Sequence, residues 1–462
     1  MIIGRKEEIR DLKNYYESNK AEFIVVFGRR RVGKTFLIRE YFKDELFFFC
    51  STTEKDNLQT QYIKFSKSLG IDTVISSWVE GFSILEKIIK ETDLTKKKVI
   101  FIDEIPWFSK KSKLFMSFLD NFWNTFAAFR EDVLFIVSGS AGNFMNDEIL
   151  NSTGGLYNRK TGIIYLRPFS LRECDDLLKS KGLELSQMEV LDSYMIFGGI
   201  PYYYSFFKKG YSVVQNVDML FFSFSGALKD EYDTIFTSLF KNSELYKNII
   251  ELLGNKDMGY SREEIVEKLK TYETGKITKY LKNLISCGFI QKYSCFPNYK
   301  KKSVYQLTDN FCYFYIKNIK DKNINDSHYW ANQSEKGQYN AWRGYAFERV
   351  CYNHFEQIRT KLGISGVSNM FANWRSKEAQ IDLLISRADK IIDLIEIKYC
   401  NQVYEIDRND FDKLHNKKNS FREVTKINKT VHKVLITPLG VLVNRFYNVI
   451  DFVITLEDLF VY

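Results

Sequence analysis

The stretch FIVVFGRRRVGKTFLIREYF, residues 23–42, decides the fold of the N-terminal part of this chain. It opens with five apolar residues, typical of a buried strand, and ends in a run with helical character. Between them, GRRRVGKT at 28–35 fits G-x-x-x-x-G-K-[ST], a loop whose backbone N–H groups surround phosphate oxygens. The alternative is a plain glycine turn between a strand and a helix. The order of strand, loop and helix favours a phosphate-binding loop.

The loop supplies the first candidate site residues. Gly28 and Gly33 let the backbone wrap around phosphate, Lys34 would reach the β- and γ-phosphates, and the Thr35 hydroxyl would hold Mg²⁺. The residues expected to contact the nucleotide are Gly28, Arg29, Arg30, Arg31, Val32, Gly33, Lys34, Thr35 and Phe36. The predicted cofactors are therefore ATP and Mg²⁺.

An acidic motif completes this site. VIFIDE at 99–104 reads as a buried strand that ends in Asp103 and Glu104. Asp103 would help to hold the metal as part of its coordination shell, and Glu104 would polarise the attacking water. LFIVSGS at 134–140 ends in Ser138 and Ser140, either of which could sense the γ-phosphate, although a small turn explains each serine equally well. Together these motifs predict ATP binding and hydrolysis.

Composition and pattern set the wider frame. The chain has 462 residues, 45% of them hydrophobic and 27% charged, and its net charge of +9 leans mildly toward anionic partners. The seven cysteines are scattered singly, which suits a reducing compartment. MIIGRKEEIRDLKNYY at 1–16 lacks the apolar segment of a signal peptide, and no run could span a bilayer. We expect a soluble cytoplasmic protein with no membrane partner.

The order of apolar runs predicts an α/β fold with several domains. Short apolar runs alternate with amphipathic stretches up to residue 168, as in a parallel sheet covered by helices. We expect a P-loop core over 1–168, a helical lid with GGIP over 169–240, a winged helix over 241–320 and a C-terminal α/β domain over 335–462. The polar stretch 320–339 lacks periodicity and is the expected linker.

The winged-helix expectation rests on residues 244–320. Ser261 is a plausible N-cap, ITKYLKNLI at 277–285 has an apolar helical face, and a Tyr/Phe-rich stretch would form a two-stranded wing. Eight lysines and one acid, Glu273, occur between 270 and 302. This charge favours contact with DNA phosphates, without a clear reader of bases. A packing or regulatory role for the module, with solvated lysines, is the alternative.

A second charged constellation lies in AQIDLLISRADKIIDLIEIKYC, 379–400. Period-two alternation puts Glu396 and Lys398 on one strand face, and the turn at 387–390 would bring Asp382 beside them. Glu348 lies upstream on a predicted helix and would complete a metal shell with Asp382, Glu396 and the Ile397 carbonyl. Such oxygen ligands suit Mg²⁺ or Mn²⁺ in phosphodiester hydrolysis, with Lys398 orienting the water. The alternative is an edge hairpin with solvated charges.

Six stretches occur in an order typical of one family: IIGRKEEI (2–9), GRRRVGKT (28–35), VIFIDEIPW (99–107), IVSGSAGNFM (136–145), LYNRKTGIIYLRPFS (156–170) and GGIPYYY (198–204). Residues 1–320 thereby resemble the archaeal-type ATPases with a GxP motif, an AAA+-related group close to the STAND signalling NTPases. The resemblance implies that the segment around Ile3, Gly4 and Arg5 lies near the adenine and that GGIP marks the lid helices. It also makes Arg159 a γ-phosphate contact, in cis or from a neighbour, with an ordinary surface arginine as the alternative.

Residues 335–462 resemble the PD-(D/E)xK nuclease superfamily, in particular a domain of unknown assignment often found C-terminal to these ATPases. Gln380 and Ile381 stand where the family pattern has a proline before the aspartate. The resemblance implies a restriction-endonuclease-like fold. The whole chain would then be an ATP-controlled nuclease acting on nucleic acid, DNA above all. A nucleotide switch with a non-cutting C-terminal module is the alternative, and both a homo-oligomer and a regulatory protein partner stay open.

Overall fold

The computed structural model describes residues 1–92, 96–140, 159–240, 242–256, 258–270, 274–297, 303–322, 324, 326–334, 336–376 and 378–462. The chain divides into unit 1, Met1–Pro168 with Thr237–Lys241, and unit 2, Phe169–Phe236 with Asn242–Tyr462. In the described ranges, no helix is both long enough and apolar enough to cross a membrane.

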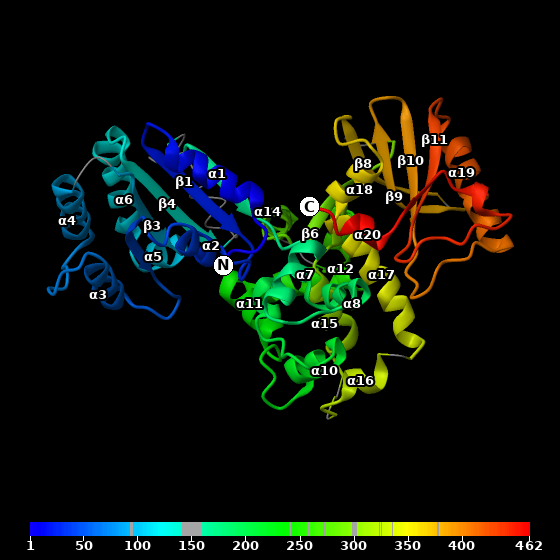
Figure 1. Cartoon of the computed structure of the whole chain (residues 1–462), viewed down its shortest axis with the longest axis horizontal. Coiled ribbons are helices and arrows are strands. Elements are labelled where there is room, and N and C mark those ends of the chain that lie inside the picture. The colour runs from blue at the N-terminus through cyan, green and yellow to red at the C-terminus, as the bar shows by residue number, and fades with distance from the viewer. Residues whose placement is uncertain are drawn as a thin grey trace. The chain divides into compact units, whose positions relative to one another are not determined.

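Unit 1 is built on a five-stranded parallel sheet in the order β2-β3-β4-β1-β5 (Figure 1). Its strands are β1 (Glu22–Gly28), β2 (Leu46–Ser51), β3 (Lys98–Asp103), β4 (Val133–Ser140) and β5 (Gly162–Leu166). All four neighbouring pairs are parallel. The apolar runs of β3 and β4 are buried almost throughout, because helices cover both faces of a parallel sheet. The sheet expected from the sequence is therefore confirmed.

The helices of unit 1 pack an aromatic core against this sheet. They are α1 (Lys6–Glu17), α2 (Lys34–Tyr41), α3 (Leu58–Ser68), α4 (Trp78–Glu91), α5 (Ile105–Lys111), α6 (Lys113–Thr125) and the short 3-10 helix η1 (Ala127–Phe129). Trp78 contacts Phe65, Phe108 and Phe115 edge to face at 4.8–5.7 Å between ring centroids. Such pairs add about 0.5–1.5 kcal/mol each beyond area burial.

Unit 2 begins with helices whose starts are encoded locally. Ser170, Ser186 and Ser212 each form a capping box at the start of a helix. The elements are α7 (Leu171–Ser180), α8 (Gln187–Phe197), α9 (Pro201–Tyr204), α10 (Val213–Val217) and the π-helix η3 (Asp218–Phe222). GGIP lies between α8 and α9, and α11 (Glu231–Leu239) crosses the unit boundary at Phe236.

Three helices and a hairpin follow. They are α12 (Ser243–Gly254), α13 (Arg262–Lys268), α14 (Thr274–Ser286), β6 (Ile290–Cys295) and β7 (Ser303–Leu307). Ser261 caps α13 in a capping box with Glu264, which confirms the expected N-cap. Ile277, Leu281 and Leu284 on α14 are fully buried, as their spacing predicts. Lys300, Lys301 and Lys302 lie outside the described residues, as does Glu273.

The C-terminal part of unit 2 adds five strands to that hairpin. The seven-stranded sheet has the order β12-β11-β10-β9-β8-β6-β7. Its further strands are β8 (Asn369–Arg375), β9 (Gln380–Arg387), β10 (Ile391–Ile397), β11 (Thr430–Ile436) and β12 (Phe452–Ile454). Helices α17 (Gln338–Asn353), α18 (Phe355–Lys361), α19 (Arg408–Thr425) and α20 (Leu456–Leu459) accompany it, with the 3-10 helix η4 (Tyr447–Val449) (Figure 1).

The expected two-stranded wing is thus part of a larger sheet. Ser294 and Cys295 of β6 pair in parallel with Ala372 and Asn373 of β8. The outer edge of β6 is therefore partly occupied by a backbone neighbour from the C-terminal strands. An unpaired strand edge would attract a partner, and here the partner comes from the same chain.

The expected linker at 320–339 is also different. It contains α16 (Tyr329–Gln333), and its Trp330 is only 3% exposed. The Trp330 ring meets Phe314, Tyr339 and Trp342 edge to face, and the Trp330 backbone N–H donates to Asp218 at 2.7 Å. The segment shows no hydrophobic periodicity because a single buried residue, Trp330, anchors it to neighbouring helices, and no repeating apolar stripe is needed.

His354 ties α7 to the end of α17 inside unit 2. Its Nε2 accepts the Leu171 N–H at 2.8 Å, so Nδ1 carries the proton and donates to the Val350 carbonyl at 2.8 Å. Tyr194 packs against the ring. Burial lowers the pKa of His354 to about 4, because a charged imidazole would lose its hydration there.

His354 predicts a stability loss in acid. The unfolded chain takes up a proton near pH 6.5, while the native imidazole does so only near pH 4, so the free energy of unfolding falls as pH drops through this window. The loss reaches about 3 kcal/mol at pH 4. Hydrogen exchange of α7 and α17 peptides across a urea series at pH 7 and pH 5 measures it. In His354→Gln the free energy of unfolding should lose this part of its dependence on pH. An equal dependence on pH in the two proteins would contradict the prediction.

Candidate functional site

The loop between β1 and α2 adopts a conformation that needs its glycines. A Cβ atom at Gly28 would lie 2.3 Å from the Leu166 carbonyl oxygen of β5, so a side chain has no room there. Gly33 has φ 94° and precedes the first residue of α2. The loop therefore aims backbone N–H groups from the start of a helix at one point, which is how proteins hold phosphate.

Lys34 lies at the centre of this loop. It is buried, and its ammonium group donates to the carbonyl oxygens of Gly28 at 3.4 Å and Arg29 at 3.1 Å. It also lies 3.4 Å from Ser140 Oγ. The side chain is thus folded over the loop, with its ammonium group at the carboxyl ends of β1 and β4.

Asp103 gathers hydroxyl groups from three neighbouring segments. Thr35 donates to Asp103 Oδ2 at 2.7 Å, Ser51 at the end of β2 lies 3.4 Å from the same oxygen, and Ser138 donates to Oδ1. Burial and then the charge of Glu104 raise the pKa of Asp103. The oxygens of Asp103 and Thr35 are the hard ligands that Mg²⁺ prefers, so this pair fits the expected metal.

Ser140 connects Lys34 to Glu104. Its hydroxyl donates to Glu104 Oε1 at 3.0 Å, and its backbone N–H lies 3.4 Å from Oε2. The link exists because β4 lies between β1 and β3, so the carboxyl ends of all three strands meet. Glu104 has φ 56°, a left-handed conformation that is uncommon for a residue with a side chain. Ser51 was missed at the sequence level, and its signal is a polar residue ending an apolar strand.

The N-terminal segment reaches the same loop through Arg5. Arg5 is 5% exposed and donates to the Val32 carbonyl at 3.1 Å and to the Arg167 carbonyl at 2.7 Å. Arg5 and Gly4 both have positive φ, and Ile3 is partly buried. The guanidinium group therefore holds the phosphate-binding loop and the exit of β5 to the start of α1.

Arg5→Met should weaken unit 1 specifically. It removes charge-assisted hydrogen bonds to two backbone carbonyls, of which the bond to Val32 is buried, at a cost of about 2–4 kcal/mol in the free energy of opening. Hydrogen exchange of peptides from α1 and residues 28–35 should show the loss. Arg10→Met, which changes an exposed arginine on the same helix, serves as the control. Equal protection of these peptides in both variants would show that Arg5 does not hold the loop.

The other expected nucleotide contacts are spread out. Val32 and Arg29 are buried, Arg30 and Arg31 are partly buried, and Phe36 is 55% exposed. Arg159 is exposed. Burial raises the pKa of Asp120, and the nearby charge of Arg159 offsets part of this rise. Residues 141–158, which precede Arg159, lie outside the described residues. No nucleotide contact of Arg159 follows from these positions.

The charged hairpin of unit 2 forms a tight cluster. Leu383 pairs with Ile395 across antiparallel β9 and β10, which confirms the predicted strand pairing. Asp382, the residue before Leu383, accepts the Ile397 N–H at 2.9 Å. Glu396 lies 2.9 Å from the ammonium group of Lys398, as expected for side chains on one face of a strand. Asp382, Glu396 and Lys398 are therefore together.

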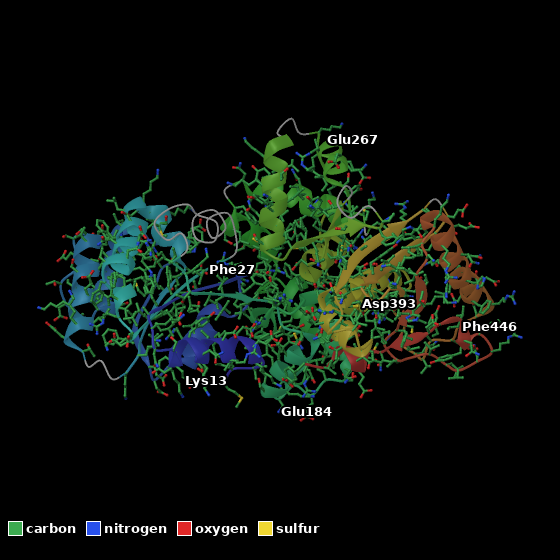
Figure 2. All side chains as sticks on the ribbon, turned by 90° about the horizontal axis from the view of Figure 1, so that it is seen from above. Lys13, Phe27, Glu184, Glu267, Asp393 and Phe446 are labelled. Carbon is green, nitrogen blue, oxygen red and sulfur yellow. The ribbon has the colours of Figure 1, made fainter. Side chains whose placement is uncertain are left out.

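Charged neighbours in this cluster shift the pKa values of Asp382 and Lys398. Burial and then the Glu396 carboxylate raise the pKa of Asp382 to about 7. Burial alone would lower the pKa of Lys398, but Glu396 and Asp382 raise it overall. Asp393, labelled in Figure 2, is on the opposite face of β10 and pairs with His432 at 3.3 Å. That second acid belongs to the packing between β10 and β11.

Lys417 of α19 was missed by sequence reasoning. Its ammonium group lies 2.5 Å from Glu396 Oε2, so two lysines engage the two oxygens of one carboxylate. Lys417 also lines a polar cavity of about 530 Å³ with Gln380, Lys413 and Asn416. The helix carries several lysines, and nothing in the sequence marks which of them turns toward β10.

Glu348 is less closely joined to the cluster than expected. Its charge and that of Asp382 both raise the pKa values of Cys351 and Tyr352, after the larger effect of burial. Among the described residues, however, no three His, Cys, Asp or Glu side chains come together as a metal site. The predicted shell of three carboxylates is therefore not formed, and Asp382 with Glu396 is the pair that fits a cation.

Residues 2–205 match the family described as the ATPase domain predominantly from Archaea. This segment is therefore similar to archaeal-type ATPase domains. The motif order from GRRRVGKT to GGIP lies within it. The site residues of unit 1 up to Arg159 lie within the matched segment, and the family that it is similar to implies ATP and Mg²⁺ as ligands.

Two relatives from Methanocaldococcus jannaschii are similar to different lengths of the chain. One, described as an uncharacterized protein, is 25% identical over 412 residues, covering 86% of this chain and 88% of its own. Another, described as an uncharacterized ATP-binding protein, is 44% identical over 45 residues, covering 10% of this chain and 76% of its own. The first similarity extends well beyond the ATPase domain into the C-terminal half.

Two solved structures are similar to part of the chain. The Walker-type ATPase PABY2304 of Pyrococcus abyssi has a TM-score of 0.47 at 20% identity, covering 68% of this chain and 96% of that one. The ORC2 protein of Aeropyrum pernix, in its ADPNP-ADP complexes, has a TM-score of 0.40 at 14% identity, covering 66% and 89%.

Proposed function

We propose that the chain hydrolyses ATP in unit 1 and cleaves nucleic acid in unit 2. The observation that carries the first half is the shared network of Lys34, Thr35, Asp103 and Glu104 at the ends of β1, β3 and β4. Lys34 binds the β- and γ-phosphates, while Thr35 and Asp103 hold Mg²⁺, which would neutralise phosphate charge. Glu104, held by Ser140, orients and deprotonates the attacking water.

The second half of the proposal rests on the cluster at β9 and β10. Asp382 and Glu396 would hold the divalent cation, which would polarise a water molecule and shield the phosphate. Lys398 would orient that water or stabilise the developing charge, and Glu348 would support the cluster from α17. The adjoining cavity with Lys413 and Lys417 would take the phosphodiester backbone.

A non-cutting switch is the second candidate, and one observation favours it. Lys398 and Lys417 each pair with one oxygen of the Glu396 carboxylate. If this ion cluster is permanent, β9, β10 and α19 form an interaction module that ATP state could control. Cleavage would instead require Lys417 to leave Glu396 when a cation binds.

A nuclease assay separates these two functions. The full chain is incubated with single- and double-stranded DNA and with RNA, with Mg²⁺ or Mn²⁺, with and without ATP. Cleavage that needs the metal and is lost in Lys398→Ala supports the proposal. Metal-dependent cleavage that survives in Lys398→Ala and Glu396→Gln would place the cutting site elsewhere, and no cleavage of any substrate would favour the switch.

Binding of DNA by α14 is a separate prediction. Lys276, Lys279 and Lys282 are exposed on this helix. Changing all three to alanine should weaken binding of duplex DNA about tenfold or more and reduce the salt slope of log K by about 2–3. Fluorescence anisotropy at several salt concentrations measures both. The exposed lysines Lys208, Lys209 and Lys229 provide a charge-matched control, and an equal loss in both triple variants would remove α14 from the interface.

A further inference from the structure

A second cavity in unit 2 has no part in either proposed reaction. It has a volume of about 520 Å³ and lies between the end of α15 (Asn310–Asn318) and the start of α17. This volume is within the range of about 300–1,000 Å³ that small-molecule sites occupy. None of the residues assigned above to ATP hydrolysis or to cleavage lines it.

Two buried donors on its wall have no protein partner. Asn318 is 1% exposed and Trp342 is 6% exposed. Within the described part of the chain, Asn318 Nδ2 and Trp342 Nε1 form no hydrogen bond. Leaving a buried donor unpaired costs about 1–3 kcal/mol, so a site that keeps two of them beside a cavity suits a ligand with acceptor atoms.

Two cations on the same wall also lack a counter-ion. Lys317 and Lys322 both line the cavity. Among the described residues, neither ammonium group has a carboxylate within 4.0 Å. Lys320, between them in sequence, is instead held by Glu251 at 3.1 Å and Asp321 at 3.0 Å. The ligand should therefore be anionic as well as rich in acceptors.

Aromatic rings complete the lining. Tyr313, Tyr339 and Tyr345 line the cavity together with Trp342. Lys317 Nζ lies 5.7 Å from the ring centroid of Tyr313, and Lys322 Nζ lies 5.9 Å from that of Tyr339. An aromatic ring can stack on a nucleotide base, and a lysine ammonium group beside it can pair with the phosphate of the same nucleotide.

We propose that this cavity binds a nucleotide, with the phosphate at Lys317 and Lys322 and the base against the aromatic lining. Asn318 and Trp342 donate to acceptor atoms of the ligand. The nucleotide is either free or part of a single strand, since both offer the same phosphate and ring. This site is independent of the phosphate-binding loop and of the cleavage cluster.

Calorimetry on the full-length Lys34→Ala chain tests this site with the phosphate-binding loop disabled. The probes are AMP, UMP, a six-residue thymidine oligonucleotide and inorganic phosphate. AMP and UMP are each expected to bind at one site per chain, and Lys317→Ala combined with Lys322→Ala should weaken their binding about tenfold or more, equal to about 1.4 kcal/mol. Trp342→Phe keeps a ring but removes the donor and should weaken binding about fivefold, in line with one lost hydrogen bond.

Lys320→Ala is the matched control, because this lysine is paired and does not line the cavity. Binding of AMP or UMP identifies a free nucleotide as the ligand, and binding of the oligonucleotide alone identifies a single strand. The proposal is overturned by no binding of any probe, by inorganic phosphate binding as tightly as the nucleotides, or by an equal loss of affinity in Lys320→Ala and the double variant.

Discussion

Lys34→Ala should lower kcat for ATP hydrolysis about 10²–10³-fold, the loss that follows removal of one charged contact to a transition state. The ammonium group already lies over the loop, 3.1 Å from the Arg29 carbonyl and 3.4 Å from Ser140. It meets the transferring phosphate at little reorganisation cost. Phosphate release under saturating ATP measures kcat, and equilibrium binding of ATP measures the loss of affinity.

Lys43→Ala is the control for this experiment, because Lys43 is exposed just after α2 and changes the same charge. Hydrolysis in this variant should stay within about twofold of the unchanged chain, as surface substitutions usually do little. If Lys34→Ala instead kept its affinity for ATP and its kcat, the loop would not be the nucleotide site. Hydrogen exchange of β1 and α2 peptides would confirm that the variant is folded.

Glu396→Gln should reduce cleavage of nucleic acid about 10²–10³-fold while leaving ATP hydrolysis unchanged. Glutamine keeps the shape of the side chain but removes the charge that would hold a cation. It also removes the attraction for Lys398 and Lys417, which now lie at 2.9 and 2.5 Å. Gel analysis of a labelled substrate with Mg²⁺ measures cleavage, and phosphate release in the same samples measures hydrolysis.

Glu405→Gln changes an exposed carboxylate after the same hairpin and is the matched control. Cleavage should persist in this variant. Equal cleavage by Glu396→Gln and by the unchanged chain would contradict the assignment of the cutting site. If Glu396→Gln also lost ATP hydrolysis, and hydrogen exchange showed that unit 2 was unfolded, the substitution would be acting through folding instead.

The sequence allowed the nucleotide site to be predicted because its parts are local. GRRRVGKT follows one strand and VIFIDE ends another, and parallel strands bring such carboxyl ends to one edge. The exact links were not predictable. Whether Ser138 or Ser140 meets Asp103 depends on the insertion of β4 between β1 and β3, which no single segment encodes.

The C-terminal cluster was predictable to the same extent. The period-two pattern and the turn after Arg387 were enough to pair β9 with β10 and to place Asp382 beside Glu396. The contact of Lys417 with Glu396 was not predictable. Helix α19 connects the parallel strands β10 and β11, and several lysines occur along it. The aromatic contacts of Trp330 were missed for a similar reason, since its ring partners come from two other helices, α15 and α17.

The sequence by itself determined the elements whose signals are contiguous: the phosphate-binding loop, the acidic strand end, the capped helices and the charged hairpin. Only the tertiary structure decided the pairing of β6 with β8, the approach of Lys417 to Glu396 and the gathering of Asn318, Trp342 and two lysines around one cavity. Local periodicity states which face of an element is apolar. It does not state which distant face that element meets, because packing and register are settled by the chain as a whole.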